Sequence, residues 1–254
     1  MKFSIVTCTW NSESWIGECL SSITQQDYPE IEQVFVDGGS TDGTLERIKA
    51  VKGDVTILEG VRGGISHAMN EGVRAARGDV VAHLHSDDFY VAPDVLSRVA
   101  TAFRTRDADW LYGRCMSVVD GVLTENDFVT KPYSWHALIR NNIVPHPATF
   151  MRRSTFLDLG GFDPGYRYAM DYDLWLRAAR IGAPIQLSDY LAAFRFHAGS
   201  LSTVNARAGH REALSVRLRH AGTGSLERVE HLARYGVRMA KLSMRSQARG
   251  GFRA

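Results

Sequence analysis

The sequence predicts an α/β fold in which a mostly parallel, Rossmann-like sheet is flanked by helices. Short apolar segments alternate with amphipathic segments of helical period, which is the pattern of βα units. Acidic residues follow two of the apolar segments directly, as at the carboxyl edge of a parallel sheet. The chain has 254 residues and is 44% hydrophobic, which is enough for one substantial core.

The first half of the chain alternates regularly. The expected strands are residues 3–7, 31–36, 55–59 and 80–84. The expected helices are residues 14–25, 44–51, 65–76 and 93–103. Helix 14–25 places Trp15, Ile16 and Ile23 on one face, and the residues before helix 44–51 are rich in capping side chains.

Regularity weakens in the second half. We expect a hairpin or a bent pair of strands from 110–118 and 121–124, and a helix at 134–141. A strand is expected at 148–152 and a helix at 172–180 that Gly182 ends. Residues 206–254 read as a helical, basic extension. The expected division is therefore a catalytic domain at 1–205 and this extension at 206–254.

Composition indicates which partners and which cellular compartment to expect. The formal net charge of +2 is too small to indicate a nucleic-acid partner, and none is expected. The three cysteines show no CxxC spacing, which favours neither a disulfide framework nor a zinc knuckle and fits a reducing cytosol. No signal-peptide pattern opens the chain, and no apolar run reaches roughly 18 residues. We expect a cytoplasmic protein, or one lying peripherally on the inner face of the cell membrane.

Two acidic sites follow expected strands. Asp37 ends strand 31–36 and opens onto Gly38 and Gly39, while Asp87 and Asp88 come soon after strand 80–84. Carboxylates are hard oxygen ligands of the kind that divalent cations need. The chain lacks both GxGxxG and GxxxxGK[ST], so the charge of a bound diphosphate would have to be met by a cation. The pattern indicates a nucleoside diphosphate held through a metal.

Six segments in register resemble family 2 glycosyltransferases of the GT-A fold. The resemblance covers about residues 3–204 and rests on residues 5–11, 36–43, 68–72, 86–88, 160–163 and 170–175. It implies an inverting transferase that takes a sugar from a nucleoside diphosphate, usually with Mn²⁺ or Mg²⁺.

The resemblance assigns several residues to the nucleotide-sugar donor. Thr9 and Trp10 match the loop that lines the base and ribose, and Asp37 matches the aspartate that bonds the nucleobase. A carboxylate can select the imide N–H of uracil or thymine, which favours a UDP- or dTDP-sugar. Asp37 could instead only cap the strand end. Asp87 matches a contact to the ribose or to a metal-bound water.

A second donor segment follows residue 60. Gly64 and Asn70 match the segment that supports the sugar and ribose. Many members carry arginine just before this asparagine, but here the residue is Met69, which puts a side-chain phosphate contact in doubt. Small residues that only allow close helix packing are the alternative.

Metal and base assignments also come from the resemblance. Asp88 matches the metal-binding aspartate of a DxD-like motif, although Ser86 stands two positions before it. His197 matches a histidine that returns to the diphosphate and metal; a core or surface histidine is the alternative. Asp171 matches the base that takes the acceptor proton, with a helix cap as the alternative.

The tail from residue 225 onwards combines basic residues with an apolar helical face at Leu226, Val229, Ala233, Val237, Ala240 and Met244. This face could lie on an anionic membrane surface or pack on the domain. The whole pattern predicts a metal-dependent inverting glycosyltransferase of surface polysaccharide or glycolipid assembly, with a saccharide or lipid-linked saccharide acceptor. A non-catalytic nucleotide-sugar-binding partner protein and a nucleotidyltransferase are the alternatives.

Overall fold

A computed structural model of the chain describes residues 1–125, 132–197, 205–222 and 224–250. The strands of this part are β1 (Phe3–Thr9), β2 (Ile31–Asp37), β3 (Asp54–Leu58), β4 (Val80–His83), β5 (Phe89–Tyr90), β6 (Trp110–Val119), β7 (Val122–Thr124), β8 (Thr149–Arg152) and β9 (Ile185–Phe196). The helices are α1 (Ile16–Thr24), α2 (Thr44–Lys49), α3 (Ile65–Ala75), α4 (Val95–Thr105), α5 (Trp135–Arg140), the 3₁₀ turn η2 (His146–Ala148), α6 (Arg153–Asp158), α7 (Met170–Ile181), α9 (Ala206–His220) and α10 (Ser225–Gly250).

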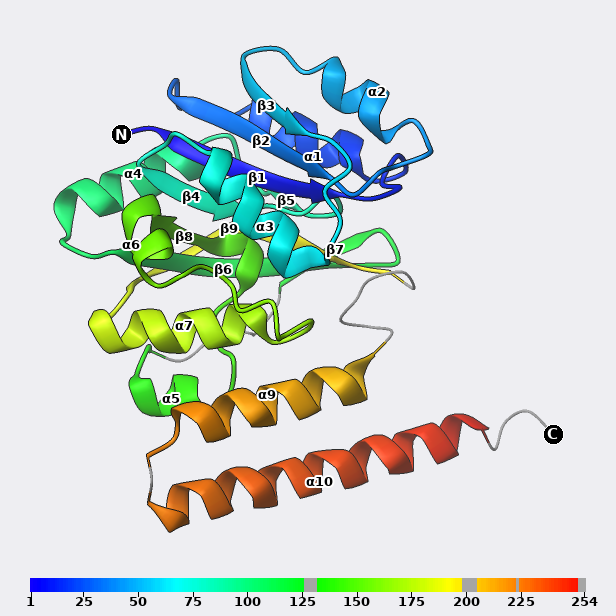
Figure 1. Cartoon of the computed structure of the whole chain (residues 1–254), viewed down its shortest axis with the longest axis vertical. Helices are drawn as coiled ribbons and strands as arrows, with labels where there is room; N and C mark the ends of the chain where they lie inside the picture. Colours follow the sequence, from blue (N-terminus) through cyan, green and yellow to red (C-terminus); the bar gives the residue numbers. More distant parts are fainter. Residues whose placement is uncertain (126–131, 198–204, 223, 251–254) are drawn as a thin grey trace.

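The strands form one mixed sheet with the order β3-β2-β1-β4-β8-β6-β9-β5, and β7 pairs with β6 at the side (Figure 1). The pairs among β3, β2, β1 and β4 are parallel, as expected from the regular first half of the chain. Beyond β4 the pairing becomes mixed, because β8 runs antiparallel to both β4 and β6 while β9 runs parallel to β6. Half of the sheet is therefore less parallel than the sequence predicts.

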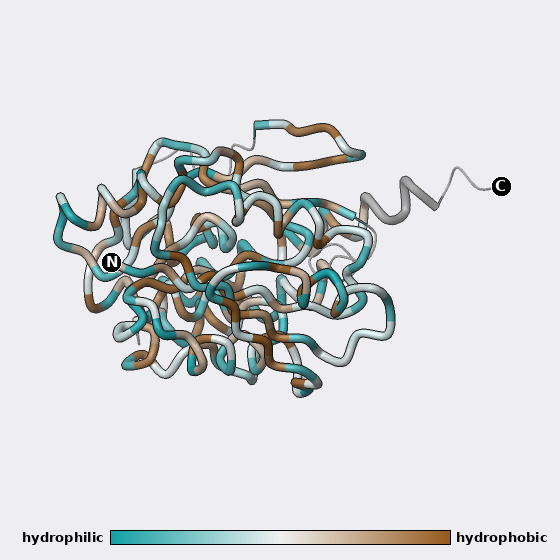
Figure 2. The backbone as a smooth tube through the Cα atoms, turned by 90° about the horizontal axis from the view of Figure 1, so that it is seen from above, coloured by the Kyte–Doolittle hydropathy of each residue, from teal (hydrophilic) through white to brown (hydrophobic). Residues whose placement is uncertain are grey.

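Helices cover both faces of the sheet because side chains alternate along the strands. Val6 and Cys8 of β1 join one core cluster with α3 and α7, while Phe3 and Ile5 join another with α1 and α4. Brown, hydrophobic segments accordingly gather inside the trace in Figure 2. Helix α3 lies especially close to β1, since a Cβ added to Gly72 would stand 2.4 Å from Val6 Cγ1.

Two connections give the second half its shape. The β6–β7 hairpin turns at Asp120 and Gly121, which both have positive φ, as an Asp-Gly hairpin turn requires. The sequence analysis gave no bounds for the long strand β9. Buried and exposed residues do not alternate cleanly along this strand, and its register with β6 shifts between Tyr112 and Cys115. Strand β9 matters for the site because its end pairs with β5, just after the Asp87–Asp88 pair.

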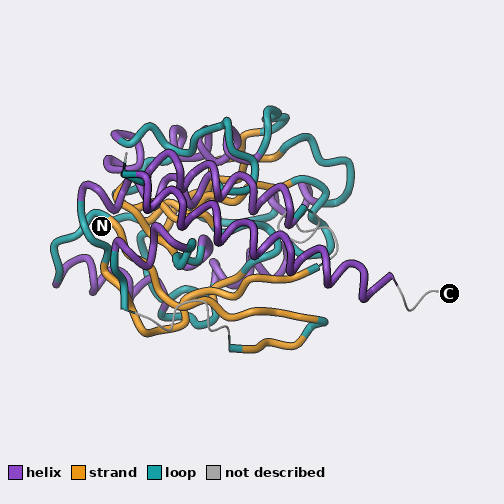
Figure 3. Tube along the Cα trace, turned by 90° about the horizontal axis from the view of Figure 1, so that it is seen from below, coloured by secondary structure: helices purple, strands orange, loops and turns teal. Residues whose placement is uncertain are grey.

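The C-terminal helices form two further layers beneath α7 (Figures 1 and 3). Helix α9 contacts α5 and α7, and its Val216 belongs to the same core cluster as Trp175. The domain boundary expected at residue 205 stays a prediction, although α9 is built into this core. Helix α10 packs on α9. Within the described ranges, the chain forms no helix with the length and apolarity needed to traverse a bilayer.

Candidate active site

Asp37 organises the loop between β2 and α2. Its carboxylate is fully buried and accepts hydrogen bonds from Thr9 Oγ1 at 3.0 Å, Ser40 Oγ at 2.5 Å, and the backbone N–H groups of Gly39 and Ser40 at 2.7 and 2.8 Å. Burial alone would raise the pKa of Asp37, but these bonds outweigh it and lower the pKa. They use the four acceptor positions of the carboxylate. A contact from Asp37 to a nucleobase would require one of them to exchange, and the hydroxyls of Ser40 and Thr9 are the donors that can rotate.

Two planar side chains flank the glycines after Asp37. Trp10 is 72% exposed, and its Cγ would lie 3.7 Å from a Cβ added to Gly38. The exposed side chain of Arg62 lies beside Gly39, and its Nη2 would stand 3.2 Å from a Cβ added to that glycine. Arg62 was not found from the sequence. Its position after β3, at the edge shared with β2, was the signal that could have identified it.

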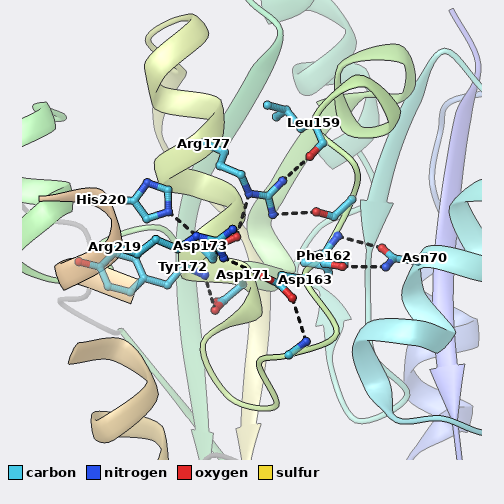
Figure 4. A network of polar contacts seen from close by, with 12 residues as sticks. Asn70, Leu159, Phe162, Asp163, Asp171, Tyr172, Asp173, Arg177, Arg219 and His220 are labelled. Atoms are coloured by element: carbon cyan, nitrogen blue, oxygen red, sulfur yellow. Dashed lines mark hydrogen bonds and ion pairs between the residues drawn. The ribbon is translucent and has the colours of Figure 1, made fainter. Parts of the chain in front are cut away.

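The second donor segment lies at the start of α3 and in its first half. Gly64 stands at the start of α3 with a φ of 94°, and a Cβ there would meet nothing within 4 Å. The Asn70 side chain bonds the backbone of Phe162. Its Nδ2 donates to the Phe162 carbonyl at 2.8 Å and its Oδ1 accepts from the Phe162 amide at 2.9 Å (Figure 4). Both ends of the Asn70 amide are thus occupied by backbone, which favours a structural role for Asn70 over the expected donor contact.

The acidic pair meets the end of β9. Asp87 Oδ2 lies 2.9 Å from His197 Nε2, and Asp88 Oδ1 accepts from the Arg195 amide at 3.3 Å. Asp88 Oδ2 is buried and has no hydrogen-bond partner. Burial, and then the neighbouring Asp87 charge, raise the pKa of Asp88 well above its usual value. The structure therefore brings together Asp87, Asp88 and His197, as predicted from separate segments.

A divalent cation fits this pair of carboxylates. An unpartnered buried carboxylate oxygen is costly, and a cation would supply the missing partner. In the described parts of the chain, His, Cys, Asp and Glu side chains nowhere gather as a metal-holding group of three or more. Asp87 and Asp88 would then hold the cation together with diphosphate and water oxygens, as magnesium-type sites usually do. His197 would act on this site through Asp87.

Asp171 lies in the first turn of α7. Its Oδ1 accepts from the Tyr172 amide at 2.6 Å, and its Oδ2 accepts from Asn142 Nδ2 at 3.1 Å. The Nδ1 atom of His146 stands 4.0 Å from the same Oδ2. Burial raises the pKa of Asp171 to about 6, against the lowering effect of its hydrogen bonds. A carboxylate with this pKa is ionised at neutral pH and still basic enough to accept a proton.

One of two stacked histidines stands two residues before Asp87, and the other stands near Asp171. The rings of His85 and His146 lie 5.1 Å apart at an angle of 14°. Burial lowers the pKa of both imidazoles, so both are neutral at pH 7, although the Asp87 charge partly opposes this at His85. The Asp87 charge thus acts on His85, His85 stacks on His146, and His146 Nδ1 lies 4.0 Å from Asp171 Oδ2. The sequence reasoning did not single out His85, although its place two residues before Asp87 could have identified it.

Comparison with known proteins decides the family. The profile described as Glycosyl transferase family 2 matches residues 4–158, which is more than half of the chain. The chain belongs to glycosyl transferase family 2. A PGL/p-HBAD biosynthesis glycosyltransferase of Mycobacterium tuberculosis is 31% identical over 181 residues, which are 69% of this chain and 68% of the relative. Chondroitin synthase of Pasteurella multocida is 30% identical over 184 residues, which are 70% of this chain but 19% of that protein.

Solved structures show the same fold. The S. aureus protein TarS (residues 1–349) in complex with UDP-GlcNAc matches with a TM-score of 0.74 at 23% identity, over 91% of this chain and 69% of that chain. The mannosyltransferase PcManGT of Pyrobaculum calidifontis, in complex with GDP-Man and Mn²⁺, matches with a TM-score of 0.68 at 22% identity, over 92% and 69%. The GT-A fold predicted for this chain is confirmed, and the chain is a glycosyltransferase.

In this glycosyltransferase, Asp173, the second aspartate of α7, has a structural role (Figure 4). Asp173 is fully buried and bonds His220 Nε2 and Arg177 Nε, both at 2.8 Å. Arg177 also donates to the carbonyls of Leu159 and Gly161 at 2.6 and 2.7 Å. Burial would raise the pKa of Asp173, but His220 and Arg177 hold it below the usual value. This network joins α7 to α9 and to the loop before α7.

Proposed function

We propose that this enzyme is a metal-dependent, inverting glycosyltransferase that moves a sugar from a nucleoside-diphosphate sugar, of UDP or dTDP type, to a hydroxyl acceptor. One observation carries the proposal. Asp88 has a buried carboxylate oxygen without a partner, Asp171 has a raised pKa, and His146, which stacks on His85, lies 4.0 Å from Asp171. A cation site and a general base are the two groups that such a transfer needs.

The residues then divide the reaction between them. Asp171 takes the proton as the acceptor oxygen forms its bond to the anomeric carbon, and the bond from that carbon to the diphosphate breaks on the opposite side. The diphosphate leaves with the bonding electron pair. A cation held by Asp87 and Asp88 would neutralise charge on this leaving group. His146, whose pKa is lowered by burial, lies 4.0 Å from Asp171 as a neutral imidazole.

The donor nucleotide is assigned to the β1–β2 edge. Trp10 and Arg62 offer planar faces on which a base can stack. Thr9, which donates to Asp37, lies next to Trp10 at the end of β1. A uracil or thymine imide could replace the Ser40 hydroxyl on the Asp37 carboxylate. The S. aureus neighbour in complex with UDP-GlcNAc supports a uridine donor. The neighbour PcManGT is in complex with GDP-Man, so a guanosine donor is the competing outcome of the test.

The acceptor that we propose is a saccharide or a lipid-linked saccharide of surface polysaccharide or glycolipid assembly. The relative named for PGL biosynthesis and the relative named chondroitin synthase support a glycan or glycolipid product. We place the enzyme in the cytoplasm or peripherally on the inner face of the cell membrane.

A thermal-unfolding screen tests the donor and metal together. UDP-, dTDP- and GDP-sugars are added with Mn²⁺, with Mg²⁺ or with chelator, since a ligand at about 100 times its dissociation constant adds roughly 2.7 kcal/mol to stability. We expect stabilisation by UDP- or dTDP-sugars only when the metal is present. Asp171→Asn should keep this stabilisation and lose transfer. Equal stabilisation with chelator, or normal transfer by Asp171→Asn, would contradict the proposal.

A further inference from the structure

Helix α10 has one face that holds it to the rest of the enzyme. His231 is 1% exposed, and Tyr235, Met239 and Leu242 are half-buried on the same side. An ion pair of 2.8 Å joins Glu230 to Arg140 of α5, and Arg228 Nη1 donates to the Leu218 carbonyl of α9 at 2.9 Å. The orientation of α10 about its own axis is therefore set by contacts to α5 and α9.

The opposite face of α10 carries an apolar stripe that nothing in the described structure covers. The stripe consists of residues three or four apart: Leu226, Val229, Ala233, Val237, Ala240 and Met244. Leu226 is 84% exposed, Val229 59%, Val237 58% and Met244 61%. Helix α10 is also the outermost layer of the molecule (Figure 1). The apolar helical face expected from the sequence is thus directed away from the domain, so packing on the domain does not account for it.

Basic residues follow one edge of this stripe. Arg234, Arg238 and Lys241 are exposed, and each directly follows a stripe residue, so all three lie on the same side of it. The acidic residues of the helix stand near its start, where Glu227 accepts from the Gly222 amide and Glu230 pairs with Arg140 and, at 3.4 Å, with Arg234. No acidic residue occurs in the sequence from 231 onwards. The exposed part of α10 is therefore apolar and positively charged.

We propose that this stripe lies in the interfacial region of an anionic phospholipid bilayer, with α10 parallel to the membrane plane. An exposed apolar face with basic residues beside it is how interfacial helices bind such surfaces. A second copy of the chain fits less well, because two α10 helices packed antiparallel through their stripes would bring their basic edges together. The inference names a partner surface for the proposed function. Its test needs no sugar transfer, so the two can fail separately.

The test is co-sedimentation of the full chain with vesicles of phosphatidylcholine, with or without phosphatidylglycerol. We expect binding to the anionic vesicles that weakens as salt is raised. Val237→Asp should reduce this binding about tenfold or more, and replacing Arg234, Arg238 and Lys241 by Gln should reduce it about fivefold for each charge removed. Circular dichroism should show unchanged folding, because these positions are exposed.

Val122→Asp is the matched control. It makes the same substitution at a valine of similar exposure, 61%, in the β6–β7 hairpin that projects from the sheet (Figures 2 and 3). Retained binding by this variant supports the proposal. Equal loss in both variants, binding independent of phosphatidylglycerol, no binding by the unmodified chain, or a dimer in solution that Val237→Asp dissociates would each overturn it.

Discussion

Glu212 of α9 accepts the backbone N–H of Tyr168 at 2.6 Å, directly before the helix that carries Asp171. The same carboxylate also accepts the N–H groups of Arg167 and Ala169, each at 3.0 Å. The start of α7, where Asp171 stands, is thus fixed by a side chain from the C-terminal part of the chain. Glu212 acts as a positioning residue for the proposed base.

Glu212→Ala should therefore affect stability and turnover together. Hydrogen bonds to a charged group contribute about 1.5–3 kcal/mol each, so we expect the free energy of unfolding to fall by about 2 kcal/mol or more. With Asp171 less well placed, kcat should fall about tenfold while the donor KM stays constant. Denaturant unfolding and steady-state kinetics measure the two effects. Glu227→Gln is the control, since Glu227 accepts a backbone N–H from Gly222 and lies near the C-terminal end of α7, away from Asp171. An equal fall in its kcat would argue against positioning.

The pKa of Asp171, raised to about 6 by burial, predicts opposite effects on activity and stability. Transfer should increase as the pH rises through about 6, because only the ionised carboxylate accepts a proton. Stability behaves in the other direction, since a folded-state pKa above the unfolded value contributes stability that is lost as pH rises through 6. Asp171→Asn should therefore be more stable than the unmodified enzyme by about 3 kcal/mol near pH 8, and by much less near pH 4. Urea unfolding at both pH values measures this; a pH-independent difference would refute the burial argument.

Removal of the cation should affect the enzyme through Asp88. Because burial and Asp87 raise the pKa of Asp88, its ionised form destabilises the metal-free fold as pH rises through that pKa. Mn²⁺ should raise the melting temperature most at neutral and higher pH. Asp88→Asn should abolish this increase, whereas Asp107→Asn, at an exposed carboxylate, should not. Calorimetry with Mn²⁺ and with chelator decides the matter, and a metal response that survives Asp88→Asn would exclude this site.

Asn70→Ala should lower stability without changing donor affinity. The substitution leaves the buried N–H and carbonyl of Phe162 without partners, at a cost of about 2 kcal/mol or more. Because Asn70 is turned towards Phe162, the dissociation constant of the nucleotide should stay within about twofold of its original value. Calorimetric titration measures the affinity. A large loss of affinity in a folded variant would restore the donor contact that the family resemblance implies.

Trp10 and Arg62 should show the reverse pattern. Each side chain is exposed, so its replacement by Ala should leave the melting temperature nearly unchanged. Loss of a stacking face should weaken nucleotide binding about tenfold. The same titration measures this, with Arg74→Ala on α3 as the control for loss of an exposed arginine. Unchanged affinity in both variants would move the nucleotide away from the β1–β2 edge.

The sequence predicted what local patterns determine. Regular alternation located the strands of the parallel half, and the Asp87–Asp88 pair was placed correctly because it follows an apolar strand. It could not predict that Asn70 turns to the backbone of Phe162, since the two are separated by 92 positions. Nor did it predict that His85 stacks on His146, because ring stacking depends on how η2 and β4 meet in space. Contacts between residues far apart in the sequence determine these features, and the local sequence pattern does not reveal such contacts.

The burial of Asp173 against His220 bears on how this chain can be engineered. A chimera that joined another protein's C-terminal helices at residue 205 would lose the imidazole that this carboxylate needs, along with Val216 in the core. A junction placed after Ala221 would preserve both and would exchange only α10. Helix α10 can thus be exchanged without disturbing the core, whereas α9 has to be kept together with the sheet.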